Sequence, residues 1–196
     1  GIQDRVFDLS TGTAAVRFEA VTIAGGYASG SDGGGIRSNN TTLTIVDSIL
    51  RDNVNTDNPG GGLIQNTGNL TITNSTFSNN SSPFGGGIDF FGAGTATITN
   101  TTVNGNTSTN SGGGLYVDHV NAIVNVSNST FTNNTATNQG GGGIFIGNGT
   151  LSVTDSVLSN NTSNFEGGGL HNLSLGGTVT VTRTTVSNNT KGGLFS

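Results

Sequence analysis

Apolar residues recur along the chain at a spacing of about 27 residues. Each copy reads apolar-x-apolar-x-[ND]-[ST]-x-apolar-x-x-Asn, then a variable loop, the phrase Gly-Gly-Gly-[Ile/Leu] and a second variable loop. The first apolar position occurs seven times, at steps of 27, 27, 26, 28, 27 and 28 residues: Val16, Leu43, Leu70, Ala96, Val124, Leu151 and Val179. Internal repetition with a period of about 20–50 residues is typical of solenoid proteins.

Within each copy the local pattern predicts β-strand. Apolar and polar residues alternate with a period of two, as in Leu70-Thr71-Ile72-Thr73, and Thr, Val and Ile favour extended backbone. One copy has too few apolar residues to bury a core alone, whereas stacked copies pack each inward column on itself at about 4.8 Å per step. We therefore predict an all-β fold, a three-sided parallel β-helix of about seven coils of ~27 residues and about 35 Å in length.

Gly and Asn are expected to mark the corners of the coils. A Gly triplet permits positive φ and close approach of neighbouring backbones. Asn tolerates the left-handed region, and stacked Asn side chains can bond to one another along the rod. The eleventh position of the repeat is Gly26 in the first copy and Asn in the others. We predict that these asparagines form a structural ladder: Asn53, Asn80, Asn106, Asn134, Asn161 and Asn189.

The two ends of the chain differ from its middle. Residues 1–15 are predicted to form an N-terminal partial coil or cap, and residues 16–196 the β-helix repeat domain. The last copy stops at Gly192-Gly193-Leu194, so we expect an incomplete, uncapped C-terminal coil. The chain also begins at Gly1 without Met, as expected for a processed product or part of a longer chain.

Composition narrows the range of partners. The net charge is −5 with six Lys and Arg, which argues against nucleic acid because phosphate neutralisation needs clustered cations. No apolar run approaches the length of a membrane span. The chain has no Cys, so thiolate metal sites and disulfides are excluded. We predict no cofactor and no metal ion.

The glycine and asparagine phrases resemble a known family of repeats. Gly-Gly-Gly-[Ile/Leu] and Phe-x-x-Asn are similar to the GGA[ILV] and FxxN tetrapeptides of chlamydial polymorphic outer-membrane proteins, and residues 68–80 resemble the repeats of secreted bacterial β-helix proteins. The resemblance covers roughly residues 16–194. It implies a single-stranded right-handed parallel β-helix of the pectate-lyase type, an extracellular or outer-surface location, and a structural or adhesive role.

Polysaccharide lyases and hydrolases share this architecture, so we looked for their chemistry. They need clustered carboxylates with a Lys or Arg base, or a Ca²⁺ site, on adjacent coils. Stacking would bring Asp89, Asp118 and His119 towards one another on the loop side. This group lacks a second carboxylate pair and a cation, so we predict no catalytic residues. Asp155 and Arg183 occupy one column on successive coils and are expected to form an exposed ion pair, worth roughly 0–1 kcal/mol.

The outward positions of the strands form a Thr-x-Thr surface. Regular Thr arrays on solenoids occur in ice-binding β-helices, although Thr is also a favourable solvent-facing strand residue. Asn, Ser, Arg and Glu interrupt the array. The candidate binding face consists of Thr44, Thr71, Thr73, Thr97, Thr99, Thr154, Thr180 and Thr182.

Three functions follow from these patterns. The leading hypothesis is a non-enzymatic extracellular structural or adhesive module of a bacterial cell surface, joined end to end with copies of itself into a filament or linked to neighbouring domains. The alternatives are a protein that binds or degrades carbohydrates through variable loops at residues 89–95, 116–123 and 171–178, with glycans as partners, and an ice-binding protein that uses the Thr face.

Overall fold

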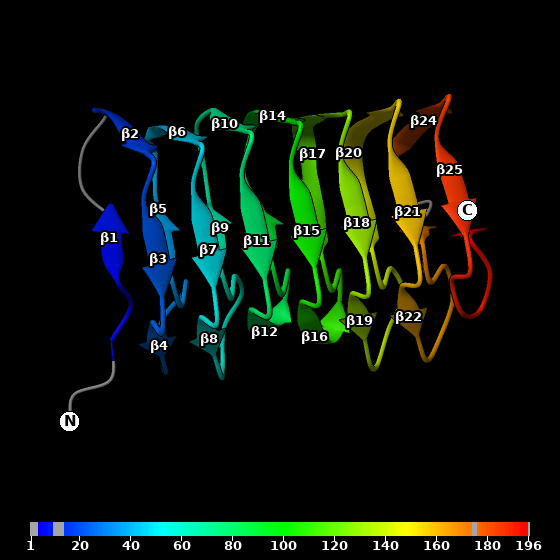
Figure 1. Ribbon diagram of the computed structural model, residues 1–196, viewed down its shortest axis with the longest axis horizontal. Helices are drawn as coiled ribbons and strands as arrows, with labels where there is room; N and C mark the ends of the chain where they lie inside the picture. Colours follow the sequence, from blue (N-terminus) through cyan, green and yellow to red (C-terminus); the bar gives the residue numbers. More distant parts are fainter. Residues whose placement is uncertain (1–3, 10–13, 174–175, 196) are drawn as a thin grey trace.

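The chain folds into a solenoid of β-strands. The computed structural model describes residues 4–9, 14–173 and 176–195, and no helix occurs among them. Successive coils lie side by side along the long axis, from the N-terminal to the C-terminal end (Figure 1). Strands of neighbouring coils pair in parallel, as expected where each coil returns to the same side after a full turn.

Within the described residues, the strands form three sheets of 13, seven and six strands. Five strands of the 13-stranded sheet begin directly after the glycines of the repeat: β5 (Ile36–Ser38), β9 (Leu63–Gln65), β13 (Ile88–Phe90), β23 (Leu170–Asn172) and β26 (Leu194–Phe195). The N-terminal strand β1 (Phe7–Leu9) pairs with β5 in the same part of the sheet. Five carry the first apolar positions: β2 (Ala15–Glu19), β6 (Thr42–Val46), β10 (Leu70–Thr73), β14 (Gly94–Thr99) and β24 (Thr178–Thr182). The long strands β17 (Leu115–Ser127) and β20 (Ile144–Thr154) run through both parts of this sheet.

The other two sheets complete each coil. The seven-stranded sheet contains β3 (Thr22–Ala24), β7 (Ile49–Arg51), β11 (Thr76–Ser78), β15 (Thr102–Asn104), β18 (Thr130–Thr132), β21 (Val157–Ser159) and β25 (Thr185–Ser187). The six-stranded sheet contains β4 (Tyr27–Ala28), β8 (Val54–Asn55), β12 (Ser81–Phe84), β16 (Thr107–Ser111), β19 (Thr135–Ala136) and β22 (Thr162–Ser163). The predicted solenoid is confirmed, and its seven repeats make about six turns.

The strand register follows the sequence repeat. Leu70 pairs with Leu43 on one side and Ala96 on the other, so each apolar position stacks on the same position of the next coil. These side chains fill the interior and are essentially inaccessible to solvent, with Phe77, Phe90 and Phe131 among the largest. The few apolar residues of each coil suffice because the coils share one continuous core.

The six predicted asparagines occupy one column between the seven-stranded and six-stranded sheets. At Asn106, the backbone N–H and Nδ2 both donate to Oδ1 of Asn134, at 3.0 Å each, and Nδ2 also donates to the Phe77 carbonyl at 3.0 Å. Its own Oδ1 accepts the equivalent pair of bonds from Asn80. The pattern repeats from Asn53 to Asn189, so each buried amide has its polar atoms paired.

A second ladder, which the sequence analysis did not identify, lies at the corner before the seven-stranded sheet. The backbone N–H of Ser129 donates to Oγ of Ser156 at 3.1 Å, while Oγ of Ser129 donates to the Ser127 carbonyl two residues earlier. The sixth position is Ser or Thr in six copies, and each of these hydroxyls donates to the carbonyl two residues earlier: Ser48, Ser75, Thr101, Ser129, Ser156 and Thr184. The bond from the backbone N–H to the hydroxyl of the next coil recurs at Ser48, Thr101, Ser129 and Ser156. The [ST] of the repeat was therefore the signal for this ladder.

The left-handed residues at these corners are not the ladder residues themselves. At the Asn ladder the positive φ belongs to the preceding residue, such as Asn79 at 54° and Asn133 at 55°. At the Ser/Thr ladder it belongs to the residue before the hydroxyl, such as Asn74 at 51° and Asp155 at 51°. Asn and Asp tolerate this conformation, so each corner combines a left-handed residue with a bonded ladder residue.

The glycine triplets combine both roles expected of them. In the triplet that precedes β13, Gly85 has a φ of 58°. A Cβ on Gly86 would lie 2.4 Å from the Thr107 carbonyl oxygen, and a Cβ on Gly87 would lie 2.7 Å from that of Gly114. The triplet thus supplies one left-handed residue and two positions where the backbone of the next coil leaves no room for a side chain.

At the chain ends, the described residues continue the sheets. The N-terminal strand β1 pairs in parallel with β5, and β2 begins at Ala15, next to the predicted boundary of the repeat domain. At the other end, β26 pairs with β23 through Leu170 and Leu194. The cap and domain boundaries proposed from the sequence stay predictions.

The Asn ladder can be tested in the middle of the rod. Replacing Asn106 by Ala leaves two donors of Asn80 and one buried carbonyl without their partners, so we expect the free energy of unfolding to fall by about 2–4 kcal/mol. Urea titration followed by far-UV circular dichroism measures the change. The exposed Asn164 is the matched control, and Asn164→Ala should change stability by no more than about 0.5 kcal/mol. Equal losses in the two variants would contradict a stabilising ladder.

Candidate functional site

One column of outward positions on the 13-stranded sheet concentrates the unusual side chains of this protein. It is formed by the second residue of each strand that follows a glycine triplet. In register, the column contains Arg37, Ile64, Asp89, Tyr116, Phe145 and His171. Although these positions point away from the core, the last five are buried, between 0% and 8% exposed. Residues that precede a glycine triplet can lie against them, as with Phe84 of β12 beside Tyr116.

The C-terminal half of this column is an aromatic stack. The rings of Tyr116 and Phe145 are parallel, with an interplanar angle of 4° and centroids 5.1 Å apart. Phe145 meets His171 edge to face at 5.4 Å, and Phe84 lies against the other side of Tyr116 at 5.2 Å. These separations follow from the parallel register, because equivalent residues of adjacent coils lie about one strand spacing apart.

Asp89 is the most strongly perturbed group in this column. Its side chain is 0% exposed, and neither carboxylate oxygen has a hydrogen-bond partner within the described chain. Burial raises the pKa of Asp89 well above its ordinary value, and the carboxylates of Asp32 and Asp118 raise it further. The carboxyl group is therefore protonated well above the pH at which an exposed aspartate ionises.

Asp118 and His119 have separate local roles. Asp118 accepts hydrogen bonds from the Tyr116 hydroxyl at 3.1 Å and from Nδ2 of Asn148 at 2.7 Å. Nδ1 of His119 accepts a bond from the backbone N–H of Asn121 at 3.1 Å. Both residues lie within strand β17, where the sequence predicted a variable loop at residues 116–123. The stacking that the sequence predicts brings Asp89 and Asp118 within electrostatic range. A substrate, however, cannot reach the fully covered Asp89 in this conformation.

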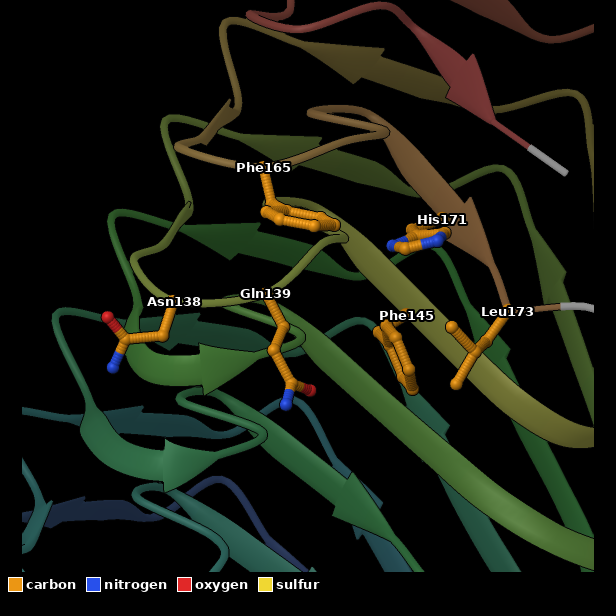
Figure 2. Close-up of a pocket in the computed structure, with 6 residues that line it drawn as sticks. All are labelled: Asn138, Gln139, Phe145, Phe165, His171 and Leu173. Carbon is orange, nitrogen blue, oxygen red and sulfur yellow. The ribbon is translucent and has the colours of Figure 1, made fainter.

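A cavity opens where the aromatic stack meets the loops after β19 and β22. Its volume is about 270 Å³, and it is lined by Asn138, Gln139, Phe145, Phe165, His171 and Leu173. Figure 2 shows Phe165 and Gln139 on one side of this space and Phe145, His171 and Leu173 on the other. The predicted binding loop at residues 171–178 contributes His171 and Leu173 to one wall, and its residues 174 and 175 lie outside the described residues. The other wall comes from loops with no repeated pattern, so the sequence did not indicate it.

The predicted Thr face lies on the outer surface of the other half of the 13-stranded sheet. Thr44, Thr71 and Thr97 are in register on adjacent strands, as are Thr73 and Thr99, and the pair Thr154 and Thr182. Thr180 aligns with Ser152. Thr180 is exposed and the other predicted members are half-buried. The row is interrupted at Ser127, whose hydroxyl lies 3.1 Å from that of Thr99.

The predicted pair between neighbouring coils is present at Asp155 and Arg183. Nε and one terminal nitrogen of Arg183 donate to the two carboxylate oxygens of Asp155, at 2.6 and 2.7 Å. Arg183 lowers the pKa of Asp155 through this contact. Both residues are exposed, so solvent screens the pair and it contributes little to stability.

No group of three or more His, Cys, Asp and Glu side chains within the described ranges is arranged to hold a metal ion. The same ranges contain no helix with the length and apolar character needed to cross a membrane.

The family model described as right handed beta helix region matches residues 8–154, about three quarters of the chain. No curated protein and no solved structure matches.

The buried acid of Asp89 predicts an unusual pH dependence of stability. Because its pKa in the folded state is raised above the unfolded value, the folded state binds more protons, and stability falls as pH rises above the ordinary carboxyl pKa. Asp89→Asn removes the ionisable group. We therefore expect Asp89→Asn to be more stable than the wild type at pH 7, with the difference shrinking towards pH 4, as measured by urea midpoints.

Asp155→Asn provides the control for this experiment. Arg183 lowers the pKa of Asp155, so this carboxylate stabilises the folded state at neutral pH and loses that effect in acid. We therefore expect Asp155→Asn to be less stable than the wild type at pH 7, with the difference shrinking in acid. An Asp89→Asn variant with the pH profile of the wild type would show that Asp89 ionises at its ordinary pKa.

Proposed function

Because this chain belongs to the right-handed β-helix family, whose fold alone does not fix a role, we propose that it is an extracellular structural or adhesive module of a bacterial cell surface. The observation that carries the proposal is the continuity of polar contacts along the rod. The Asn ladder and the Ser/Thr ladder connect one coil to the next at two corners, in addition to the parallel sheets. Such a rod holds a fixed shape without a large core in any single coil.

The composition supports a setting outside the cell. The chain has no Cys and no Met, so it lacks the two side chains that oxidants modify most readily. Only 9% of its residues are charged, and Thr, Ser and Asn supply much of the outward surface of the strands. A rigid polar rod suits the presentation of a binding surface at a distance from the cell.

The location is tested with antibodies raised against the purified chain. We expect intact cells that produce the protein to be labelled as strongly as permeabilised cells, and deletion of the gene to reduce attachment of the cells to surfaces. A cytoplasmic marker protein, labelled only after permeabilisation, is the control. Labelling that requires permeabilisation would contradict an outer-surface location.

End-to-end association is part of the proposal. The repeat register is the same along the rod, so two rods could stack with their sheets and ladders aligned, a heterologous contact that extends into a filament. Sedimentation velocity measures this directly. The weight-average sedimentation coefficient should rise with protein concentration, whereas a constant monomer value across the series would remove the filament from the proposal.

A further inference from the structure

The cavity beside Phe145 has walls that are held in place before any ligand binds. Phe145 is fixed by its parallel stack on Tyr116 and its contact with His171. On the facing wall, the backbone N–H of Gln139 donates to the Asn110 carbonyl at 3.1 Å, and its Oε1 accepts from Oγ of Ser111 at 2.7 Å. The cavity therefore needs little ordering on binding, which favours affinity.

The lining combines apolar rings with free amide donors. Phe165 is 59% exposed and Leu173 43% exposed, so both present apolar surface to the cavity mouth. Within the described chain, the Nε2 group of Gln139 and the side-chain amide of Asn138 take part in no hydrogen bond. A ligand with an apolar face and a polar edge matches this arrangement.

The electrostatics of the cavity favour an uncharged ligand. None of its six lining residues has a permanent charge, and burial lowers the pKa of His171, so its imidazole is neutral at neutral pH. The nearby carboxylate of Glu166 acts in the opposite direction on that pKa, which places a negative charge close to the imidazole. An anionic ligand would find no compensating cation among the lining residues and would be repelled by Glu166.

We propose that this cavity binds one neutral sugar ring of a glycan chain. The pyranose C–H face packs on the exposed ring of Phe165, while Phe145 and Leu173 line the apolar wall beside it, and ring hydroxyls accept hydrogen bonds from the amide of Gln139. About 270 Å³ is near the lower end of ligand pockets, so the cavity accommodates a single ring rather than an extended stretch of chain. This inference rests on the adhesive function proposed above, and it gives that function a ligand class.

The test uses hexasaccharides of β-1,4-linked glucose, mannose, galactose and N-acetylglucosamine, with hexagalacturonate as the charged counterpart. Isothermal titration calorimetry on the purified chain should show binding of at least one neutral hexasaccharide and weaker binding of the charged one. Phe165→Ala should weaken the neutral complex by about tenfold or more, because an exposed ring is lost from the contact without disturbing the core. Gln139→Glu, which keeps the acceptor for Ser111 but removes the amide donor and adds charge, should also weaken it.

The matched control is Phe91→Ala. Phe91 is 48% exposed and follows β13, two coils away from Phe145 and outside the cavity lining. Its replacement should leave affinity unchanged within about twofold. The inference is overturned if none of the four neutral hexasaccharides binds, if hexagalacturonate binds as tightly, or if Phe165→Ala and Phe91→Ala behave alike.

These outcomes are separate from those of the proposed function. Calorimetry on the purified chain does not depend on where the protein is located. Surface labelling without sugar binding would remove the cavity inference alone. Sugar binding without surface labelling would remove the cell-surface role alone.

Discussion

Hydrogen bonding from one coil to the next is the constraint on which the rest of the structure depends. A coil of about 27 residues has too little apolar surface to fold alone, and its buried polar groups find partners only on neighbouring coils. At Asn106 every polar atom of the side chain is used by a neighbouring coil. The same contacts that satisfy these groups also fix the register of the sheets and hold the glycine backbone of adjacent coils in close contact.

That register has consequences on the outer surface. Once the coils are aligned, any residue type that recurs at an outward position becomes a stack. The ring pair of Tyr116 and Phe145 is such a case, and its parallel geometry follows from the coil spacing. At Asp89 the column has a buried carboxyl group to which no described residue makes a hydrogen bond. The periodic scaffold thus imposes the positions, while the individual side chains determine the chemistry.

The cavity depends on departures from the repeat. Its two walls come from strands β20 and β23, which follow the repeat, and from the loops with Gln139 and Phe165, which do not. Binding sites on rigid scaffolds are commonly formed by such variable loops, because the sequence of a loop can change without disturbing the packing of the core beneath it. A regular rod with an irregular loop surface is consistent with the adhesive role proposed for this chain.

The sequence by itself determined the solenoid, its strand register, its inward columns and the positions of the Asn column, because each depends on a local alternation repeated at a fixed period. It also contained the signal for the Ser/Thr ladder in its sixth position, although Thr and Ser occur so widely in strands that the pattern alone did not single it out. Two features were decided only by the tertiary structure. These are the complete burial of Asp89 and the cavity beside Phe145, one wall of which comes from the non-periodic loops with Gln139 and Phe165. The cavity residues come from different coils, so no local pattern brings them together.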